Sequence, residues 1–133
     1  MSKIRVYFTF LLIGFSMISC DRNEDGKAVD DIKLSKKDII MESSQSSYTV
    51  ETRSTDYWLN EIILDGKATD LSTINNLGKN WIVVHPEFQV ERKEDGKKIV
   101  ITMNKNNSNA DRILMITLQH GNYFDGIRVT QKK

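Results

Sequence analysis

Short alternating runs of apolar residues are the feature that most restricts the fold of this chain. From Lys37 onward, apolar side chains alternate with polar ones or cluster in runs of four to eight, and turn-forming residues bound each run. In Ser47 to Arg53, for example, Tyr48, Val50 and Thr52 alternate with polar residues. Side chains repeat every two residues in a strand and every 3.6 in a helix, so this spacing predicts β-strands.

These runs and the turns between them predict a complete β-sandwich. The expected strands are Asp38 to Glu42, Ser47 to Arg53, Tyr57 to Leu64, Trp81 to Val84, Phe88 to Lys93, Lys98 to Met103, Arg112 to Gln119 and Ile127 to Gln131. Asp95-Gly96 lies between two of them, and Asp-Gly is a strong hairpin signal because both residues tolerate positive φ. Seven or eight short strands predict an all-β fold, an antiparallel immunoglobulin-like β-sandwich.

The long connection from Lys67 to Asn80 interrupts the strand pattern. It is rich in Thr, Asp, Ser, Asn and Gly, and Leu71, Ile74 and Leu77 are spaced three residues apart within it. This spacing predicts a single helical turn that packs over a sheet edge.

The N-terminal residues have the character of an export signal. Lys3 and Arg5 precede a thirteen-residue apolar run from Val6 to Ile18. A membrane-spanning helix needs roughly 20 apolar residues, so the shorter run is expected to be a cleaved signal peptide covering residues 1–19. Ser19 places a small residue before Cys20, as lipoprotein signal peptidase requires. Cys20 is therefore the predicted lipidation site and the anchor to the membrane.

The predicted mature protein divides into a tether and one domain. Residues 20–35 are rich in charge and are expected to form a flexible tether, whereas residues 36–133 form the domain. Loss of Lys3 and Arg5 lowers the Lys and Arg count from 19 to 17 against 18 Asp and Glu, a formal charge of −1. This balance argues against nucleic acid as a partner. Cys20 is the only cysteine, so no disulfide is expected within the domain.

The order of residues in the predicted domain resembles a known family. Trp58 follows an alternating strand, and the run Trp81 to Pro86 comes next. Arg112 then opens a hydrophobic strand, and the chain closes on Ile127 to Gln131. This arrangement resembles the BACON family, immunoglobulin-like domains of Bacteroidetes named for a suspected link to carbohydrate binding. The resemblance covers nearly all of the mature chain.

The resemblance carries two further implications. In the family, the tryptophans that match Trp58 and Trp81 are core residues, so both are expected to be buried. The acidic residues just after Cys20 resemble the signals that send lipoproteins of the Bacteroidetes to the outer face of the outer membrane. The implied location is therefore the bacterial cell surface, with the protein anchored to the outer membrane by lipid.

Candidate residues for catalysis or metal binding are few. Asp21 to Gly26 opens like an EF-hand loop, but Ile32 stands where the bidentate glutamate should be. His85 and His120 form no short-spaced ligand group, so no metal site is expected. Cys20 is consumed by the lipid, and no serine lies in a Gly-flanked elbow motif. The sequence predicts a protein that is not an enzyme and needs no cofactor.

Tyr123 and Phe124 are the predicted ligand contacts. They lie between Gly121 and Gly126 at the expected tip of the last hairpin, where neighbouring aromatics ordinarily need a reason to face water. The leading expectation is a non-enzymatic, lipid-anchored surface domain that binds or spaces. One alternative is a glycan-binding module, which requires a flat, exposed aromatic pair with nearby amides or carboxylates. Another is an accessory subunit of a surface protein complex, which requires an exposed apolar patch or a bare edge strand.

Overall fold

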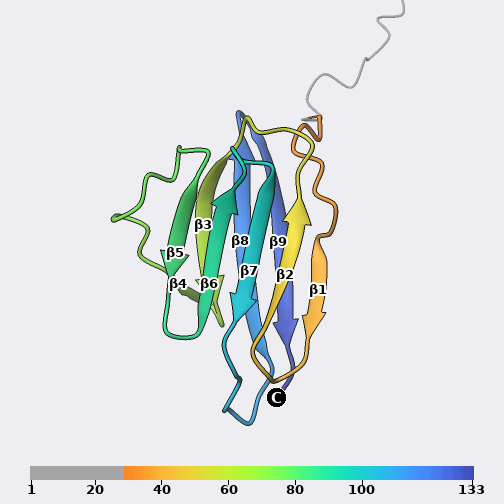
Figure 1. Cartoon of the computed structure of the whole chain (residues 1–133), viewed down its shortest axis with the longest axis vertical. Helices are drawn as coiled ribbons and strands as arrows, with labels where there is room; N and C mark the ends of the chain where they lie inside the picture. Colours follow the sequence, from red (N-terminus) through yellow and green to blue (C-terminus); the bar gives the residue numbers. More distant parts are fainter. Residues whose placement is uncertain (1–28) are drawn as a thin grey trace, which may run out of the picture.

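The computed structural model describes residues 29–133, which form two stacked β-sheets (Figure 1). The strands are β1 (Asp38–Met41), β2 (Ser46–Glu51), β3 (Trp58–Leu64), β4 (Lys67–Ala68), β5 (Trp81–Val84), β6 (Phe88–Lys93), β7 (Lys98–Met103), β8 (Arg112–His120) and β9 (Tyr123–Gln131). One sheet has the order β1-β9-β8-β3-β4, and the other has the order β2-β7-β6-β5. Neighbouring strands are antiparallel except β1 and β9, which run parallel. The predicted all-β sandwich is confirmed.

The described chain has nine strands, whereas the sequence predicted seven or eight. The additional strand is β4, whose two residues pair with the end of β3. Asp65 and Gly66 connect them with φ angles of 48° and 80°, which a two-residue hairpin turn requires. The Asp-Gly pair ends β3 as expected. It also starts a hairpin that the sequence did not reveal, because two residues are too few to show a pattern.

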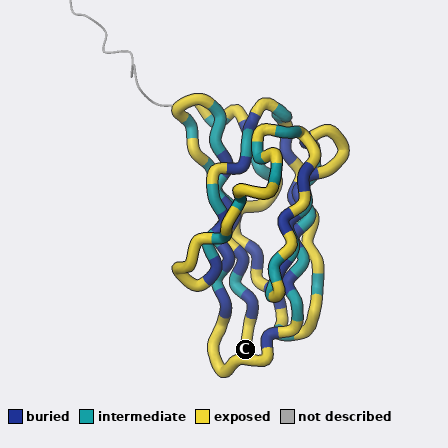
Figure 2. Tube along the Cα trace, turned by 90° about the vertical axis from the view of Figure 1, so that its left-hand side faces the viewer, coloured by how far each residue is buried: buried dark blue, intermediate teal, exposed yellow. Residues whose placement is uncertain are grey.

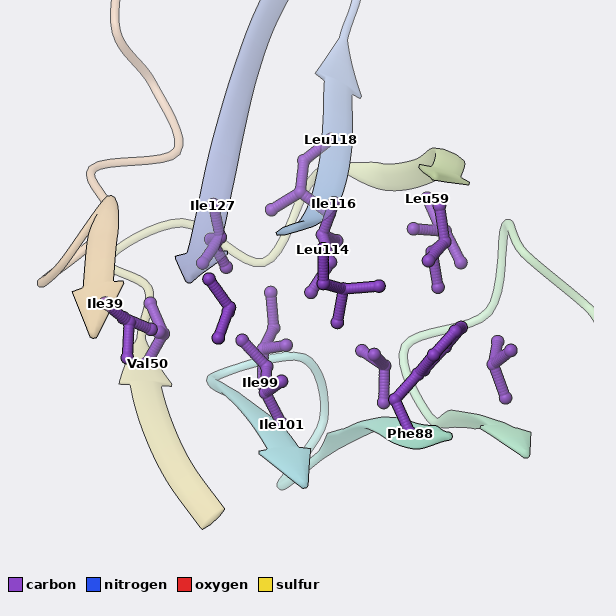
Figure 3. Close-up of a cluster of buried hydrophobic side chains, with 14 of the residues drawn as sticks. Ile39, Val50, Leu59, Phe88, Ile99, Ile101, Leu114, Ile116, Leu118 and Ile127 are labelled. Atoms are coloured by element: carbon purple, nitrogen blue, oxygen red, sulfur yellow. The ribbon is translucent and has the colours of Figure 1, made fainter. Parts of the chain in front are cut away.

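The core fills the space between the two sheets. Buried and partly exposed residues alternate along strands such as β7 and β8, and Figure 2 colours them dark blue and teal. In Figure 3, Leu114 and Ile116 of β8 face Ile99 and Ile101 of β7 across this space, and all four are fully buried. Burying one such side chain contributes roughly 1.5–3 kcal/mol, so these alternating residues provide the main driving force for the sandwich.

The domain begins earlier in the chain than the sequence predicted. Ile32 is fully buried, and its carbonyl accepts hydrogen bonds from the amides of Arg53 (3.1 Å) and Ser54 (3.4 Å). Leu34 forms an antiparallel bridge with Thr52, next to the four-stranded sheet, before β1 joins β9 in the other sheet. The predicted tether is therefore wrong at its C-terminal end. Two isolated apolar residues have no period, so their packing role could not be read from the sequence.

The connection from β4 to β5 contains turns instead of the predicted helical turn. The amide of Ile74 donates to the carbonyl of Leu71 (3.2 Å), and the amide of Gly78 donates to the carbonyl of Asn75 (2.9 Å). Leu71 and Ile74 pack against the core as expected, whereas Leu77 is 69% exposed. The connection thus covers one edge of the core and presents one apolar side chain to solvent.

A buried arginine closes the end of the sandwich where the β6–β7 turn lies. Arg92 on β6 is 1% exposed. Its guanidinium donates to the carbonyl of Tyr57 (2.7 Å), of Gly78 (2.9 Å) and of Thr55 (2.7 Å). The guanidinium carbon also lies 3.7 Å from the centre of the Tyr57 ring. Burial lowers the pKa of Arg92 from its ordinary value, yet an arginine side chain stays charged in proteins. One charged side chain therefore holds together two loops that are far apart in sequence.

The β6–β7 turn packs directly against this arginine. Glu94, Asp95 and Gly96 have φ angles of 53°, 53° and 90°, so the hairpin signal of Asp95-Gly96 is confirmed. The carbonyl of Gly96 accepts hydrogen bonds from the Thr52 hydroxyl (2.9 Å) and the Tyr57 hydroxyl (2.8 Å). The turn is thus fixed to the residue after β2 and to the chain before β3 through one backbone carbonyl.

Candidate functional site

The structure places Tyr123 and Phe124 differently from the prediction. The turn between β8 and β9 consists only of Gly121 and Asn122, and the two aromatics are the first residues of β9. Successive residues of a strand point to opposite faces, so the two rings do not form one platform. The predicted loop tip is wrong because Gly121, with φ 56°, is sufficient for a two-residue turn. The second glycine, Gly126, lies within β9 and bounds no turn.

Tyr123 has a structural role on the inner side of the sheet. It packs against the core, and its hydroxyl donates to Asp125 Oδ2 over 3.2 Å. Burial raises the pKa of the Tyr123 hydroxyl, and the neighbouring charges of Asp125 and Asp30 raise it further. Lys37 Nζ lies 2.8 Å from the same Asp125 oxygen. These contacts fasten the segment before β1 to β9, so Tyr123 is not free to contact a ligand.

Phe124 belongs to an aromatic row on the outer face of the five-stranded sheet. Trp58 of β3 lies opposite Gln119 of β8, and Gln119 lies opposite Phe124 of β9. Directly opposed residues on antiparallel neighbours share a face, so the three side chains stand side by side. Neighbouring strands are ~4.8 Å apart, which separates the Trp58 and Phe124 backbones by about 10 Å. Phe124 is 53% exposed and Trp58 is half-buried. We call Trp58, Gln119 and Phe124 the aromatic row.

A second row of small and polar residues borders the aromatic row. Glu61, Thr117 and Gly126 are opposed in register on the same three strands. The register of β3 shifts between Leu59 and Glu61, and this bulge keeps Glu61 on the outer face with Trp58. The Thr117 hydroxyl donates to Glu61 Oε1 over 3.4 Å. Gly126 has no side chain, so the surface beside Phe124 is recessed.

A groove of about 420 Å³ adjoins the aromatic row at Trp58. Its lining residues are Thr55, Asp56, Tyr57, Trp58, Leu77, Lys79 and His120. The Asn76 carbonyl accepts from the Leu59 amide (3.2 Å), and the Asn76 side-chain amide donates to the Leu59 carbonyl (3.1 Å). These two bonds hold the connection from β4 to β5 against β3, which places Leu77 and Lys79 at the groove. Trp58 is therefore shared by the groove and the aromatic row.

Two cationic or titratable side chains of the groove, Lys79 and His120, lie at its rim. Within residues 29–133, the one hydrogen bond of Lys79 Nζ is a long contact of 3.5 Å with the Thr55 hydroxyl. His120 Nδ1 lies 3.2 Å from Asp31 Oδ2, so the chain leading into the domain passes the rim of the groove. The groove thus offers a ligand the indole of Trp58, the ammonium group of Lys79 and the carboxylate of Asp56.

A second groove, of about 390 Å³, lies at the opposite end of β3. Its lining residues are Leu64, Asp65, Lys67, Ala68, Thr69, His85 and Glu87. The ring of His85 stacks on Phe88 at 4.6 Å, and Glu87 lies 3.3 Å from Arg112. The two histidines therefore lie in separate grooves. Among residues 29–133, no group of three or more His, Cys, Asp or Glu side chains is arranged to hold a metal ion.

The two tryptophans have different environments. Trp81 is 7% exposed and belongs to the core, as the family resemblance implied. Trp58 is half-buried on the outer face, so the expectation of a core residue is wrong for it. The bulge at Asn60 and the register of β3 set this orientation, and neither has a sequence signal that would have revealed it.

The predictions for the N-terminal residues lie outside the described residues. They concern the signal peptide of residues 1–19, the lipidation of Cys20 and the acidic run from Asp21 to Gly26. Within residues 29–133, no helix is long and apolar enough to cross a membrane.

Comparison with known proteins bears on the fold of this chain. No protein-family model matches the sequence, and no curated protein matches it. A protein from Bacteroides thetaiotaomicron, solved by NMR, is similar with a TM-score of 0.64 and 19% identity over 83% of this chain and 92% of its own. The titin M3 domain aligns with a TM-score of 0.42 and 6% identity over 75% of this chain and 93% of its own. The first likeness supports the β-sandwich fold.

Proposed function

We propose that this protein is a lipid-anchored domain of the bacterial cell envelope that binds glycans through the aromatic row. The observation that carries the proposal is the register of β3, β8 and β9, which aligns an indole, an amide and a phenyl ring on one exposed face. The glycan-binding alternative requires this combination. The resemblance to the BACON family points in the same direction, because the family is named for a suspected link to carbohydrate binding.

The chemistry of the row suits a saccharide chain. The apolar face of a sugar ring can stack on an exposed aromatic ring, and Trp58 and Phe124 offer two such rings about 10 Å apart. Gln119 between them has a side-chain oxygen available for a sugar hydroxyl, since its amide nitrogen already donates to the Gly121 carbonyl (3.0 Å). Glu61 and Thr117 border the row and add polar groups. The row therefore fits a short stretch of linked sugars that runs across the strands.

The site favours binding over hydrolysis. A glycosidase of the usual kind needs two carboxyl groups that flank the scissile bond, one of them protonated. The site has two carboxylates, Asp56 in the groove at Trp58 and Glu61 beside the aromatic row, where it accepts a hydrogen bond from the Thr117 hydroxyl (3.4 Å). Only Asp56 lines the groove, so the two do not flank one cleft. We therefore propose a non-enzymatic role.

Removing the indole of Trp58 is expected to weaken glycan binding by about 30-fold, equivalent to ~2 kcal/mol for a central aromatic contact. The measurement is binding of soluble Asp21 to Lys133 to a glycan array, followed by titration of Trp58→Ala against the best saccharide. Phe124→Ala is expected to lose affinity as well. Tyr48→Ala is the matched control, because Tyr48 is an exposed aromatic on the other sheet (39% exposed).

A steric variant tests the same site without removing any group. A Cβ on Gly126 would lie 3.5 Å from the Ile116 carbonyl, an ordinary contact, so Gly126→Val is expected to fold and to obstruct the row. Unchanged affinity in both Trp58→Ala and Gly126→Val would refute the assignment. If the protein bound no glycan on the array, a protein partner would be favoured instead. The edge strand β5, with Ile82 and Val84 exposed to 46% and 72%, would then be the surface to test.

Anchoring is tested separately at Cys20. Cys20→Ala is expected to abolish labelling by a radioactive or clickable fatty acid in cells and to stop processing after Ser19. The physical reason is that the lipid is bonded to the sulfur atom of Cys20, which alanine lacks. Mass spectrometry of the purified protein reads out both effects, and unchanged fatty-acid labelling of the variant would disprove the lipoprotein assignment.

A further inference from the structure

The glycan site lies at the end of the domain where the chain from Cys20 enters. Asp31 pairs with His120 at 3.2 Å, and His120 lines the groove next to Trp58. Phe124 is the second residue of β9, and the β8–β9 turn precedes it at this same end. Figure 1 shows the first described residues, in orange, at the same upper end of the sandwich as the turn between β8 and β9. Tether and site therefore share one end of the sandwich.

The length of chain before the domain limits how far this end can lie from the lipid. Cys20 and Val29 are 29 − 20 = 9 residues apart. Nine residues span at most ~30 Å even when fully extended at ~3.3–3.6 Å per residue. The strands β8 and β9 have nine residues each, so the opposite end of the domain is about 30 Å further away. The site-bearing end thus stays within about 30 Å of the lipid, whereas the opposite end can lie about 30 Å further away.

The exposed side chains at this end suit the region just above a lipid surface. Val29 is 70% exposed, Leu77 is 69% exposed and Phe124 is 53% exposed. Lys79 lies in the same groove as Leu77 and Trp58. Aromatic rings with a polar end and lysine side chains are favoured at the boundary between lipid and water.

From these positions we infer that the saccharide is carried by a glycolipid of the same membrane, and that the site is turned away from free polysaccharide beyond the cell. The inference rests on the proposed glycan-binding function and on the Cys20 anchor. The ligand class is a sugar chain bonded to a lipid, because such a chain is held at the membrane surface, within the ~30 Å that the tether allows.

The test uses one saccharide in two forms. The processed lipoprotein is inserted into vesicles of phosphatidylethanolamine and phosphatidylglycerol, with or without lipopolysaccharide in the same bilayer. Acrylamide quenching of tryptophan fluorescence reports mainly on Trp58, since Trp81 is 7% exposed. Quenching is expected to fall when lipopolysaccharide is present, and Trp58→Phe is expected to lose this change.

The second form is the lipid-free polysaccharide coupled to agarose beads. Vesicles bearing the native lipoprotein are expected to be captured poorly. A variant with a 20-residue Gly-Ser insertion after Lys27 is expected to be captured at least about tenfold better, because a longer tether lets the site face outward. Equal capture with the native and the lengthened tether would overturn the inference about orientation. Failure of the soluble domain to bind the beads or lipopolysaccharide vesicles would remove the proposed function itself, so the two failures are distinguishable.

Discussion

Replacing Arg92 with methionine is expected to lower the free energy of unfolding by about 3 kcal/mol, although methionine fills a similar volume. The guanidinium supplies hydrogen bonds of 2.7, 2.9 and 2.7 Å to the carbonyls of Tyr57, Gly78 and Thr55. Each buried carbonyl left without a donor costs roughly 1–3 kcal/mol. The loss is partly offset because a buried charge no longer has to be desolvated. Urea denaturation followed by tryptophan fluorescence measures the change.

Lys93→Met is the matched control for this prediction. Lys93 is the next residue of β6 and is exposed, so the same chemical change is expected to alter stability by no more than about 0.5 kcal/mol. Arg92→Met should also loosen the groove, because Thr55 and Tyr57 line it and Gly78 lies between Leu77 and Lys79. A loss below about 1 kcal/mol would show that the surrounding loops are held by other contacts.

The sequence identified most of the strands because alternation is a local signal. The predicted bounds of β5, β6 and β7 agree with the structure, and Asp95-Gly96 forms the expected hairpin turn. Arg92 was overlooked although its position carried a signal. It follows Phe88 and Val90 at a spacing of two, which places it on the buried face of β6. The residue type suggested exposure, whereas the period correctly indicated burial.

The aromatic row could not have been predicted from local patterns. Trp58 on β3 is far in sequence from Gln119 and Phe124, which belong to the β8–β9 hairpin, and two features set the alignment of the three residues. One is the bulge between Leu59 and Glu61, and the other is the two-residue turn at Gly121. A shift of one residue in either register would move Trp58 or Phe124 to the other face of the sheet. Register is a property of the paired strands, so single-strand periodicity cannot reveal it.

Substituting Gly96 with alanine is expected to cost about 3 kcal/mol, far more than a surface turn residue ordinarily costs. Its φ of 90° is strained for any residue with a Cβ, which accounts for roughly 1–2 kcal/mol. The added Cβ would also lie 2.5 Å from Arg92 Nη2, and three hydrogen bonds keep that guanidinium from moving. The expected result in a urea titration is a midpoint lowered nearly as much as that of Arg92→Met.

Gly66→Ala separates backbone strain from the clash at Gly96. Gly66 has a similar φ of 80°, and a Cβ there would meet nothing within 4 Å. Its substitution is therefore expected to cost only the strain, about 1 kcal/mol. A double-mutant cycle completes the argument, because Gly96→Ala should cost clearly less in the Arg92→Met background if the clash with the guanidinium contributes. Equal costs for Gly96→Ala and Gly66→Ala, or full additivity in the cycle, would mean that the turn and the buried arginine are energetically independent.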